Sequence, residues 1–390
     1  MSFVSTRLHD LKPSQTLAIT AEAKKLIQQG EDVCSFGAGE PDMDTPDFIK
    51  EAAIEALHRG ETKYTAVSGI MELREAIATK LVAENGIPSA PELVTVSCGA
   101  KHALFNAIYA LCEDDDEVII PAPYWTSYPD MVKMTGADPV IVETKAENGW
   151  KMTPEEFEEA MSPRTKLLIL NSPSNPTGAV YTKEELEKIA EIAIGEDVLV
   201  ISDEIYEKLV YGEAEHVSLA SLGEEIAKLT LTVNGFSKAY SMTGWRLGYT
   251  SAPEEYAKVI NSIQSQTTSN PTSFAQYGGL AALTHPSAAQ VISDMRDEFD
   301  VRRQYMLNRL ASIENVSTVE PEGAFYFLVD TSKIGINSLN LAERLLSRDK
   351  VAVIPGAAFG HDQSVRFSYA CGLDIIKNGM DRFEDFCRSF

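Results

Sequence analysis

Residues that could do chemistry follow two apolar runs in the middle of the chain. Asp203 closely follows one run, and Tyr206 lies three residues further on. Lys238 follows the next run, and Arg246 lies eight residues later. A lysine amine can form a Schiff base with an aldehyde, and a guanidinium binds phosphate or carboxylate groups. A carboxylate placed after a buried strand is partly desolvated and needs a cationic partner.

Weaker signals follow three other apolar runs. Gly99, Ala100 and Lys101 form a glycine turn that opens a predicted helix, where free N–H groups bind phosphate well. Trp125 belongs to an aromatic cluster, and Asn175 lies in a loop restrained by flanking prolines. Taken singly, these features are more often an ordinary turn, a core tryptophan and a turn-forming asparagine.

Taken together, these side chains fit pyridoxal 5′-phosphate (PLP). Lys238 can form the Schiff base, and Asp203 can pair with the pyridinium nitrogen. A phenol and an amide can hydrogen-bond to the phenolate oxygen of PLP. Arg246 and the glycine turn can hold its phosphate.

Hydrophobic patterning predicts the elements that position these residues. Short apolar runs alternate with amphipathic stretches, which is typical of parallel strands joined by helices. The predicted strands cover residues 93–97, 118–121, 139–142, 167–170, 198–202, 229–233 and 247–251. Between two of them, residues 182–194 form a predicted helix capped by Thr182. Ligands bind beyond the carboxyl ends of such strands, so we expect the site residues to converge there.

The last third of the chain predicts a smaller α+β unit. A long amphipathic stretch at 287–310 precedes strands at 325–329, 351–354 and 365–368 and a final helix, and we expect a long helix within 253–310 to connect the units. The predicted fold class is therefore α/β, with a mostly parallel central sheet flanked by helices and a second domain.

Composition narrows the classes of protein. The 390 residues carry a net charge of −24, which disfavours nucleic acids and anionic membranes as partners. Five cysteines without CxxC spacing and six unpaired histidines indicate neither a disulfide framework nor a metal site. No apolar stretch is long enough to span a bilayer, and no signal peptide is recognised. These observations predict a cytoplasmic location.

Seven segments, in order, resemble the class I PLP-dependent aminotransferases of fold type I. They are FGAGEPD (36–42), KYTAVSG (63–69), PYWTSYPDM (123–131), NSPSNPTGAVY (171–181), SDEIYEKLVY (202–211), SKAYSMTGWRLGY (237–249) and VRFSYA (365–370). The resemblance runs from about residue 14 to the end of the sequence and is greatest to the bacterial aspartate aminotransferase subgroup. Some members of that subgroup also transaminate prephenate. For this family the expected domains are an arm at 1–14, a small domain at 15–45 and 290–390, and a large PLP-binding domain at 46–289.

The resemblance implies a role for each matching residue. Lys238 is the expected covalent attachment point and proton carrier, Asp203 the partner of the ring nitrogen and Trp125 the ring's stacking partner. Tyr206 and Asn175 are expected to contact the phenolate oxygen. The expected phosphate ligands are Gly99, Ala100, Lys101, Ser237, Arg246 and, from the second subunit of a homodimer with shared active sites, Tyr64. The expected substrate contacts are Arg366 for the α-carboxylate, Gly39, Trp125 and Asn175.

Two positions depart from the family's pattern. Gly235 stands where some members have a serine that contacts the phosphate. Residues 266–273 contain no arginine, although classical aspartate aminotransferases bring a partner-subunit arginine to the side-chain carboxylate from this stretch. Lys101, which matches a lysine of the bacterial subgroup, and Lys12 are therefore the candidates for binding that distal carboxylate.

The predicted activity is a ping-pong transfer of the amino group between L-aspartate and 2-oxoglutarate, giving oxaloacetate and L-glutamate, with prephenate as a further possible acceptor. Three alternatives remain open. They are a broader aromatic or alanine aminotransferase, a noncatalytic PLP-binding protein, and an NAD-binding enzyme, although no GxGxxG motif follows the first strand. The sequence leaves the amino donor and the pathway open.

Overall fold

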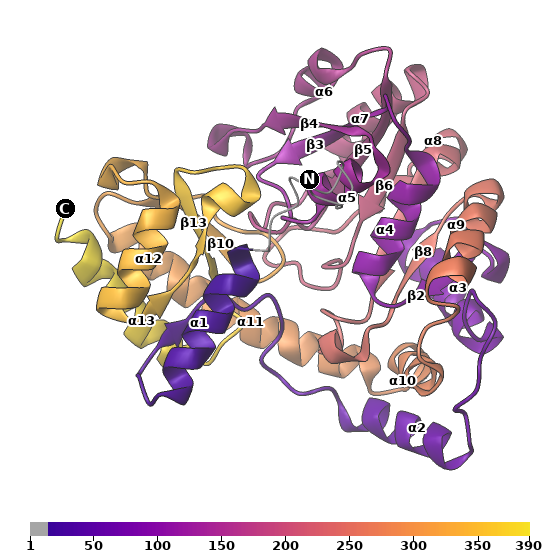
Figure 1. The fold of residues 1–390 in the computed structure, drawn as a ribbon, viewed down its shortest axis with the longest axis horizontal. Helices are drawn as coiled ribbons and strands as arrows, with labels where there is room; N and C mark the ends of the chain where they lie inside the picture. The colour runs from indigo at the N-terminus through magenta and orange to yellow at the C-terminus, as the bar shows by residue number, and fades with distance from the viewer. Residues whose placement is uncertain (1–14) are drawn as a thin grey trace, which may run out of the picture.

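The computed structural model describes residues 15–390, and its largest element is a seven-stranded sheet (Figure 1). The strand order is β2-β8-β7-β6-β5-β3-β4, and only β8 runs antiparallel to its neighbours. The strands are β2 (Val94–Ser97), β3 (Glu117–Ala122), β4 (Asp138–Glu143), β5 (Thr165–Asn171), β6 (Leu199–Asp203), β7 (Thr230–Gly235) and β8 (Gly248–Ser251). All seven predicted strands, and the mostly parallel sheet, are confirmed.

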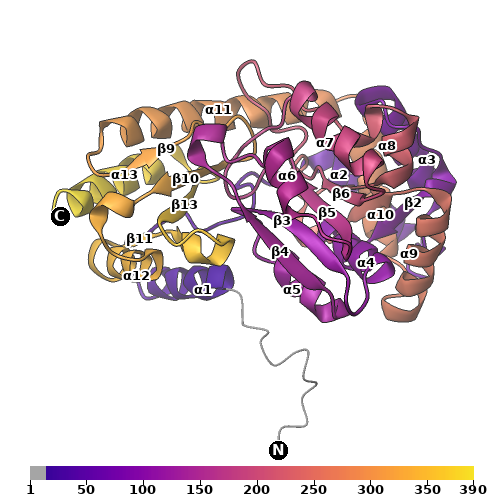
Figure 2. The same ribbon diagram turned by 90° about the horizontal axis from the view of Figure 1, so that it is seen from above.

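Helices cover both faces of this sheet, which is why its strands are continuous apolar runs. Val118 and Ile120 of β3 belong to the core on one face, and Ile119 belongs to the core on the other. The first face is covered by α4 (Ala100–Leu111), α5 (Tyr128–Thr135) and α9 (Glu254–Thr267), and the second by α6 (Pro154–Ala160), α7 (Lys183–Gly195) and α8 (Glu224–Leu229). Figure 2 shows the two groups on opposite sides of the sheet.

The start of α7 agrees with the sequence. The backbone N–H of Glu185 donates to Thr182 Oγ1 (3.3 Å), and the Thr182 N–H donates to the Glu185 carboxylate (2.8 Å). This reciprocal pair satisfies two N–H groups that have no partner within the helix.

Three helices occupy residues 253–310, and the last of them, which has 25 residues, is the long connecting helix expected within this stretch. They are α9, α10 (Ser273–Thr284) and α11 (Ala288–Ser312). Ser269 has a left-handed backbone (φ 65°), and Pro271 and Pro286 cannot donate the N–H that a continuous helix needs. The last helix, α11, runs from the large sheet to the C-terminal part (Figure 2). Near the large sheet, α10 packs with α2 (Asp47–His58) and α3 (Met71–Asn85).

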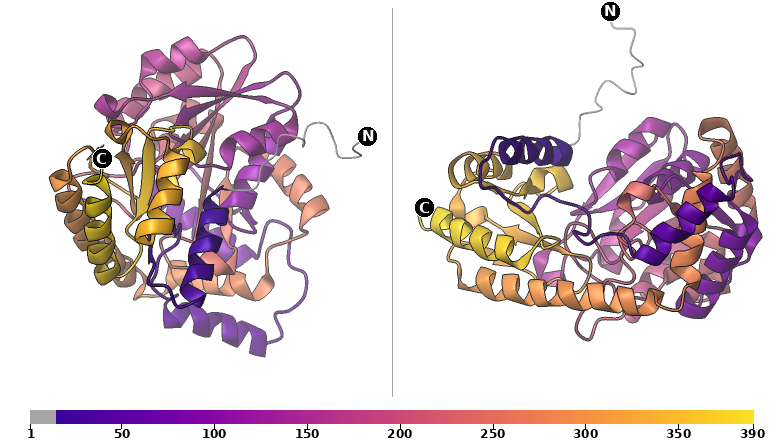
Figure 3. Two further views of the ribbon diagram at one scale, coloured as in Figure 1. Left: turned by 60° about the vertical axis from the view of Figure 1, so that its left-hand side comes forward. Right: turned by 90° about the horizontal axis from the view of Figure 1, so that it is seen from below.

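The C-terminal part has a four-stranded sheet, β12-β13-β10-β9, and a two-stranded sheet, β1-β11. Its elements are α1 (Gln15–Gln28), β1 (Cys34–Ser35), β9 (Ser317–Thr318), β10 (Tyr326–Asp330), α12 (Ser338–Asp349), β11 (Val351–Ala352), β12 (Ile354–Pro355), β13 (Ser364–Ser368) and α13 (Leu373–Cys387). Because β1 pairs with β11, the segment after α1 belongs with the end of the chain (Figure 3). The predicted strand at 351–354 is in fact two short strands, β11 and β12, which join different sheets.

Short 3₁₀ helices complete the fold: η2 (Pro91–Leu93), η3 (Ala146–Asn148), η4 (Leu219–Ser221), η5 (Thr243–Trp245), η6 (Ser332–Ile334) and η7 (Gly356–Phe359). Across residues 15–390, no helix combines the length and the apolar character needed to cross a membrane.

Candidate active site

A cavity of about 650 Å³ lies where β5, β6 and β7 end, between the large sheet and the C-terminal part. Predicted site residues line it from both sides: Gly39, Ala100, Lys101, Trp125, Asn175, Asp203, Tyr206, Ser237, Lys238, Arg246 and Arg366. The structure therefore brings together side chains that are up to 327 positions apart, from residue 39 to residue 366. Their functional roles remain predictions.

Lys238 lies at the floor of this cavity. Its ammonium group donates a hydrogen bond to the Gly39 carbonyl oxygen, and Nζ is 5.8 Å from the centre of the Tyr206 ring. Burial lowers the pKa of Lys238 to about 8, although the carboxylate of Glu40 acts in the opposite direction. A lysine with a lowered pKa has a larger neutral, nucleophilic fraction near neutral pH.

Asp203 ends β6 and is 3% exposed. The Tyr128 hydroxyl donates to Asp203 Oδ2 (2.6 Å), and the Ile205 N–H donates to Oδ1 (3.2 Å). Burial raises the pKa of Asp203 to about 6, while these two hydrogen bonds lower it. The carboxylate is thus held in a fixed orientation at the cavity wall.

Tyr128 was missed by the sequence analysis. It packs edge-on against Trp125, with ring centres 5.2 Å apart. Its position three residues after Trp125, within the same aromatic cluster, could have indicated a role in the site. A tyrosine among apolar residues of a predicted helix, however, is usually interpreted as part of the core.

One end of the cavity is positively charged. Arg246 adopts a left-handed backbone (φ 54°) and donates to the Thr243 carbonyl (2.7 Å). It approaches Gly99, the N-cap of α4, so closely that a Cβ at Gly99 would collide with the guanidinium. Lys101, the second residue of α4, has its Nζ 4.8 Å from the centre of the Trp125 ring. Partial desolvation and the nearby Arg246 lower the pKa of Lys101. Two cations and a helix N-terminus form an anion-binding region.

Arg366 comes from β13 and is buried at the cavity wall. Its Nη1 donates to Asn175 Oδ1 (2.9 Å), its Nη2 donates to the Gly37 carbonyl (3.1 Å), and its Nε has no partner within residues 15–390. The guanidinium lies 4.3 Å from the centre of the Tyr326 ring. Within the described residues, two of its five N–H donors therefore fix its orientation, and the others, including the buried Nε–H, remain for a ligand.

Tyr326 is a second residue that the sequence analysis missed. It lies in the apolar strand β10, where the pattern indicates only core, yet it lines the cavity. Its hydroxyl oxygen is 2.8 Å from that of Tyr206.

The remaining predicted residues lie elsewhere. Tyr64 is 88% exposed and does not line the cavity of this chain. Lys12 lies outside the described residues. Gly235 is in close backbone contact with Gly248 of β8, and a Cβ at Gly235 would lie 2.9 Å from the Gly248 Cα. The geometry thus leaves no room for the serine that some relatives of the family have there.

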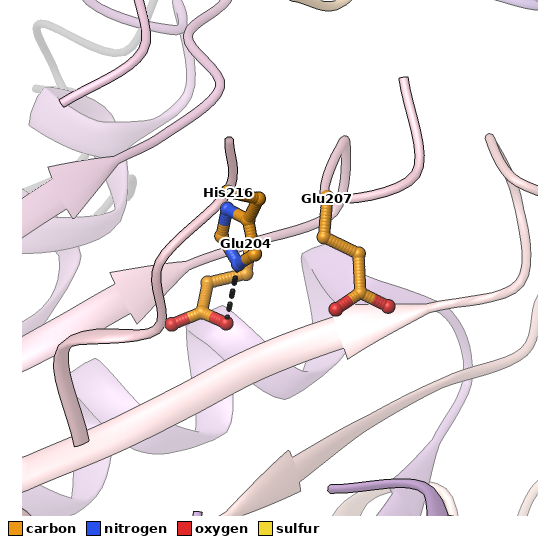
Figure 4. A group of neighbouring side chains, drawn as sticks. All are labelled: Glu204, Glu207 and His216. Carbon is orange, nitrogen blue, oxygen red and sulfur yellow. Dashed lines mark hydrogen bonds and ion pairs between the residues drawn. The ribbon is translucent and has the colours of Figure 1, made fainter. Parts of the chain in front are cut away.

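Behind Asp203, a buried polar group lies outside the cavity. Figure 4 shows Glu204, Glu207 and His216, whose potential ligand atoms lie within 4.8 Å of one another. Protein groups already hydrogen-bond to both carboxylates. The donors are Ser202, Ser218 and His216 for Glu204, and Lys80 and Asn85 for Glu207. Lys80 supplies the positive charge, so the group is a hydrogen-bonded network supporting the turn after β6.

The chain is similar to known proteins in both sequence and structure. A model of the family "Aminotransferase class I and II" matches residues 31–380. The chain is 49% identical to the probable aspartate/prephenate aminotransferase of Aquifex aeolicus over 98% of both chains. It is also similar in structure to the Thermus thermophilus aspartate aminotransferase with maleate, at a TM-score of 0.95 and 45% identity, covering 99% of this chain and 100% of that one. The aromatic aminotransferase of Pyrococcus horikoshii gives a TM-score of 0.90 at 40% identity, covering 94% and 99%.

The chain therefore belongs to the aminotransferase class I and II family. The fold and the enzyme class predicted from the sequence are confirmed.

Proposed function

We propose that this aminotransferase uses PLP bound at Lys238 to move the amino group of L-aspartate to 2-oxoglutarate, giving oxaloacetate and L-glutamate by a ping-pong mechanism. One observation carries the proposal: Lys238, Asp203 and Arg366 line a single cavity although they come from three different strands or strand ends.

The residues of the cavity fit PLP. Lys238 offers an amine whose pKa is lowered by burial to about 8. Arg246, Lys101 and the start of α4 form an anion-binding region of the kind that a phosphate requires. The Gly99 turn, which a side chain would fill, leaves the helix N–H groups accessible. When bound, PLP supplies an aldehyde and a ring that accepts electrons from the substrate.

Each side chain then has a defined task. Lys238 releases its hydrogen bond to the Gly39 carbonyl and carries a proton to and from the substrate carbon. Asp203, fixed by Tyr128, presents a carboxylate to a protonated ring nitrogen. Arg366 uses its fixed guanidinium to bind the α-carboxylate of the substrate.

A dicarboxylic substrate is supported by Lys101 and by the relatives. Several relatives are named aspartate or aspartate/prephenate aminotransferases, and the Thermus structure is described with maleate, a dicarboxylate. Lys101 and Arg366 line the cavity from different elements, α4 and β13, and Lys101 can neutralise a second carboxylate. Prephenate is a second candidate because relatives such as those of Aquifex aeolicus and Cereibacter sphaeroides are named aspartate/prephenate aminotransferases.

Replacing Lys101 with alanine tests the distal-carboxylate role. We expect kcat/KM for aspartate to fall about tenfold or more, with a much smaller loss for alanine, because only aspartate has a charge to be neutralised. Steady-state kinetics with both substrates measures the ratio. Lys133→Ala, which removes an exposed lysine of α5 outside the cavity, is the control. Equal losses for aspartate and alanine, with weaker PLP retention, would assign Lys101 to the phosphate instead.

The quaternary structure and the domains extend the proposal. The exposed Tyr64 is available to reach the phosphate site of a second subunit, which supports a homodimer with shared active sites.

We also propose that residues 15–45 and 290–390 together form one domain and residues 46–289 form the other, because the cavity lies between the parts of the structure that they contain.

Two measurements test the function directly. Reduction of the PLP-loaded protein with borohydride, followed by peptide mapping, is expected to place the label on Lys238. Single-turnover absorbance changes with aspartate, glutamate, an aromatic amino acid and alanine then rank the amino donors. A label on another lysine would overturn the assignment, and a preference for the aromatic amino acid would favour the aromatic alternative.

A further inference from the structure

Tyr326 contacts two predicted site residues that have different tasks. Its side chain is completely buried in β10, on the side of the cavity opposite the large sheet. Its hydroxyl oxygen lies 2.8 Å from that of Tyr206, and its ring centre lies 4.3 Å from Cζ of Arg366. One side chain thus touches both the phenol expected at the cofactor and the guanidinium expected at the substrate.

The hydroxyl pair has a limited number of hydrogens. Each tyrosine hydroxyl has one hydrogen to donate and can also accept. Within residues 15–390, Tyr206 and Tyr326 have no other hydrogen-bond partner for their hydroxyls. Consequently, if Tyr326 donates to Tyr206, the hydrogen of Tyr206 is free to point into the cavity. If Tyr206 donates instead, it has no hydrogen left for a ligand.

The surroundings fix the position of Tyr326. β10 is paired with β13 along five residues, in a register that places Tyr326 opposite Ser368 and Leu328 opposite Arg366. The Tyr326 ring also packs on Phe325 (4.7 Å between centres) and, at 80°, on Tyr206. A group held by a paired strand can orient its neighbours, because its own position varies little.

We propose that Tyr326 is a positioning residue that donates its O–H to Tyr206, so that the hydrogen of Tyr206 is directed into the cavity, while its ring face holds the guanidinium of Arg366. This inference rests on the proposed function, because it gives the hydrogen of Tyr206 a target in the phenolate oxygen of PLP. The hydroxyl serves the cofactor side of the cavity, and the ring serves the substrate side.

The two contributions separate in two variants. Tyr326→Phe removes the hydroxyl and keeps the ring. Without the hydrogen bond donated by Tyr326, Tyr206 is a weaker donor to the phenolate of PLP. The phenolate therefore binds a proton more tightly. The pH midpoint of the visible PLP absorption band is expected to rise by about 0.5 to 1 unit, the size of one hydrogen bond. The dissociation constant of maleate, measured by calorimetry, is expected to change less than about twofold, because the ring still faces Arg366.

Tyr326→Leu removes the ring as well. We expect the same rise in the midpoint and, in addition, at least about fivefold weaker binding of maleate, because the guanidinium loses its aromatic face. Neither measurement depends on turnover.

Tyr369→Phe is the matched control. Tyr369 is as deeply buried as Tyr326, belongs to the same core and loses one hydrogen bond, to the Ala324 carbonyl (3.2 Å), but it does not line the cavity. Its midpoint is expected to stay at the wild-type value. An unchanged midpoint in Tyr326→Phe, or an equal rise in Tyr369→Phe, would overturn the hydroxyl role. Unchanged maleate binding in Tyr326→Leu would overturn the ring role.

Failure of the proposed function has a different signature. If the wild-type protein develops no visible band with PLP and borohydride labels no lysine, both the proposed function and this inference are wrong. If the band forms and Lys238 is labelled, the proposed function stands, and the variants decide the role of Tyr326 alone.

Discussion

Burial alters the acid–base properties of Lys238 and Asp203 in opposite directions. It lowers the pKa of the lysine to about 8 and raises that of the carboxyl group to about 6. In both cases the charged form loses hydration that the protein replaces only in part. Near neutral pH the cavity therefore keeps Asp203 largely ionised while Lys238 has an appreciable neutral fraction. This is the combination that a lysine nucleophile beside a carboxylate needs.

The lowered pKa of Lys238 has a consequence for stability without cofactor. Between about pH 8 and the ordinary lysine value, the unfolded chain binds the proton and the folded chain does not, so folding becomes more favourable as pH rises through this window. Below pH 8 the folded protein carries the full cost of a buried charge. Lys238→Met removes that cost, so the variant without PLP is expected to melt at a higher temperature than wild type, with a difference that is greatest below pH 8.

Melting temperatures of the two cofactor-free proteins at pH 7 and pH 9.5 check this. The difference is expected to shrink at the higher pH. Lys258→Met, an exposed lysine paired with Glu254, is the control and should show no such trend. A stabilisation by Lys238→Met that is the same at both values would contradict the lowered pKa.

Among the residues of the site, the sequence revealed the charged ones and Tyr206 but missed two other tyrosines. Asp203 and Lys238 can be identified because a charged residue that follows a buried apolar strand is partly desolvated and needs a partner. Tyr128 and Tyr326 stand among apolar neighbours, where a tyrosine contributes to the core at no obvious cost. Only their hydroxyl distances, to Asp203 and Tyr206, distinguish them from core residues.

The turn after β6 is the element on which most of the site depends. Asp203 and Tyr206 face the cavity, whereas Glu204 and Glu207 belong to the polar network behind it. Burial opposes the ionisation of Glu207, but the charge of Lys80, with further help from Lys208, holds its pKa at about 2. The turn is thus anchored from behind by the ion pair between its own Glu207 and Lys80 of α3.

Removing Lys80 should lower the stability of the protein. Lys80→Met leaves the buried carboxylate of Glu207 without its cation, and the free energy of unfolding is expected to fall by about 3–5 kcal/mol. Lys80→Met with Glu207→Leu removes both charges and is expected to recover much of the loss. Urea-induced unfolding of the cofactor-free proteins measures the differences.

The neighbouring pair Lys208 and Glu84 supplies the control, because it joins the same regions at the surface. Glu84→Gln breaks this surface pair and leaves Lys208 beside Glu207, so it is expected to cost less than about 1 kcal/mol, since solvent screens an exposed pair. If Lys80→Met and Glu84→Gln had equal effects, the buried pair would not anchor the turn.

Element prediction succeeded where packing is uniform along the chain and failed where it changes. Six of the seven strands of the large sheet are largely buried, and the edge strand β4 is partly exposed, yet each contains a recognisable apolar run. Residues 351–354 are equally apolar, yet they supply two strands to two sheets, and nothing in their side chains marks the change at Val353. Residues 253–310 hold three helices, and the interruptions between them depend on single residues such as Ser269.

Several apolar side chains before and after Tyr64 in the sequence are exposed on the surface of the molecule. Ile54 and Leu57 of α2 and Met71 of α3 are 51%, 44% and 46% exposed, and Tyr64 itself is 88% exposed. Such groups lose contact with water when a second copy covers them. Their position on the segments before and after Tyr64 fits the proposed homodimer, in which each subunit would complete the cavity of the other.

A subunit-mixing experiment tests shared sites. Tyr64→Ala weakens the phosphate site of the partner subunit, and Lys238→Ala removes the lysine from its own. In a hybrid dimer of these two variants, one cavity combines an intact Lys238 with Tyr64 of the partner subunit, whereas the other has neither. Exchange of subunits is therefore expected to restore tight PLP binding and aspartate turnover at one of the two cavities. Neither variant alone has such a cavity.

Sedimentation and PLP absorbance, before and after mixing, give the measurement. Tyr109→Ala, which removes a 49% exposed tyrosine of α4, replaces Tyr64→Ala in the control mixture. The Tyr109→Ala protein should retain PLP as tightly as wild type before mixing, because its own cavities are intact. For the same reason, exchange with Lys238→Ala subunits should not increase PLP binding or turnover. If Tyr64 acts within its own subunit, every cavity in the first mixture lacks either Tyr64 or Lys238, and exchange restores nothing. A fully active monomer at high dilution would contradict the shared site more directly, because no second subunit would then supply the tyrosine.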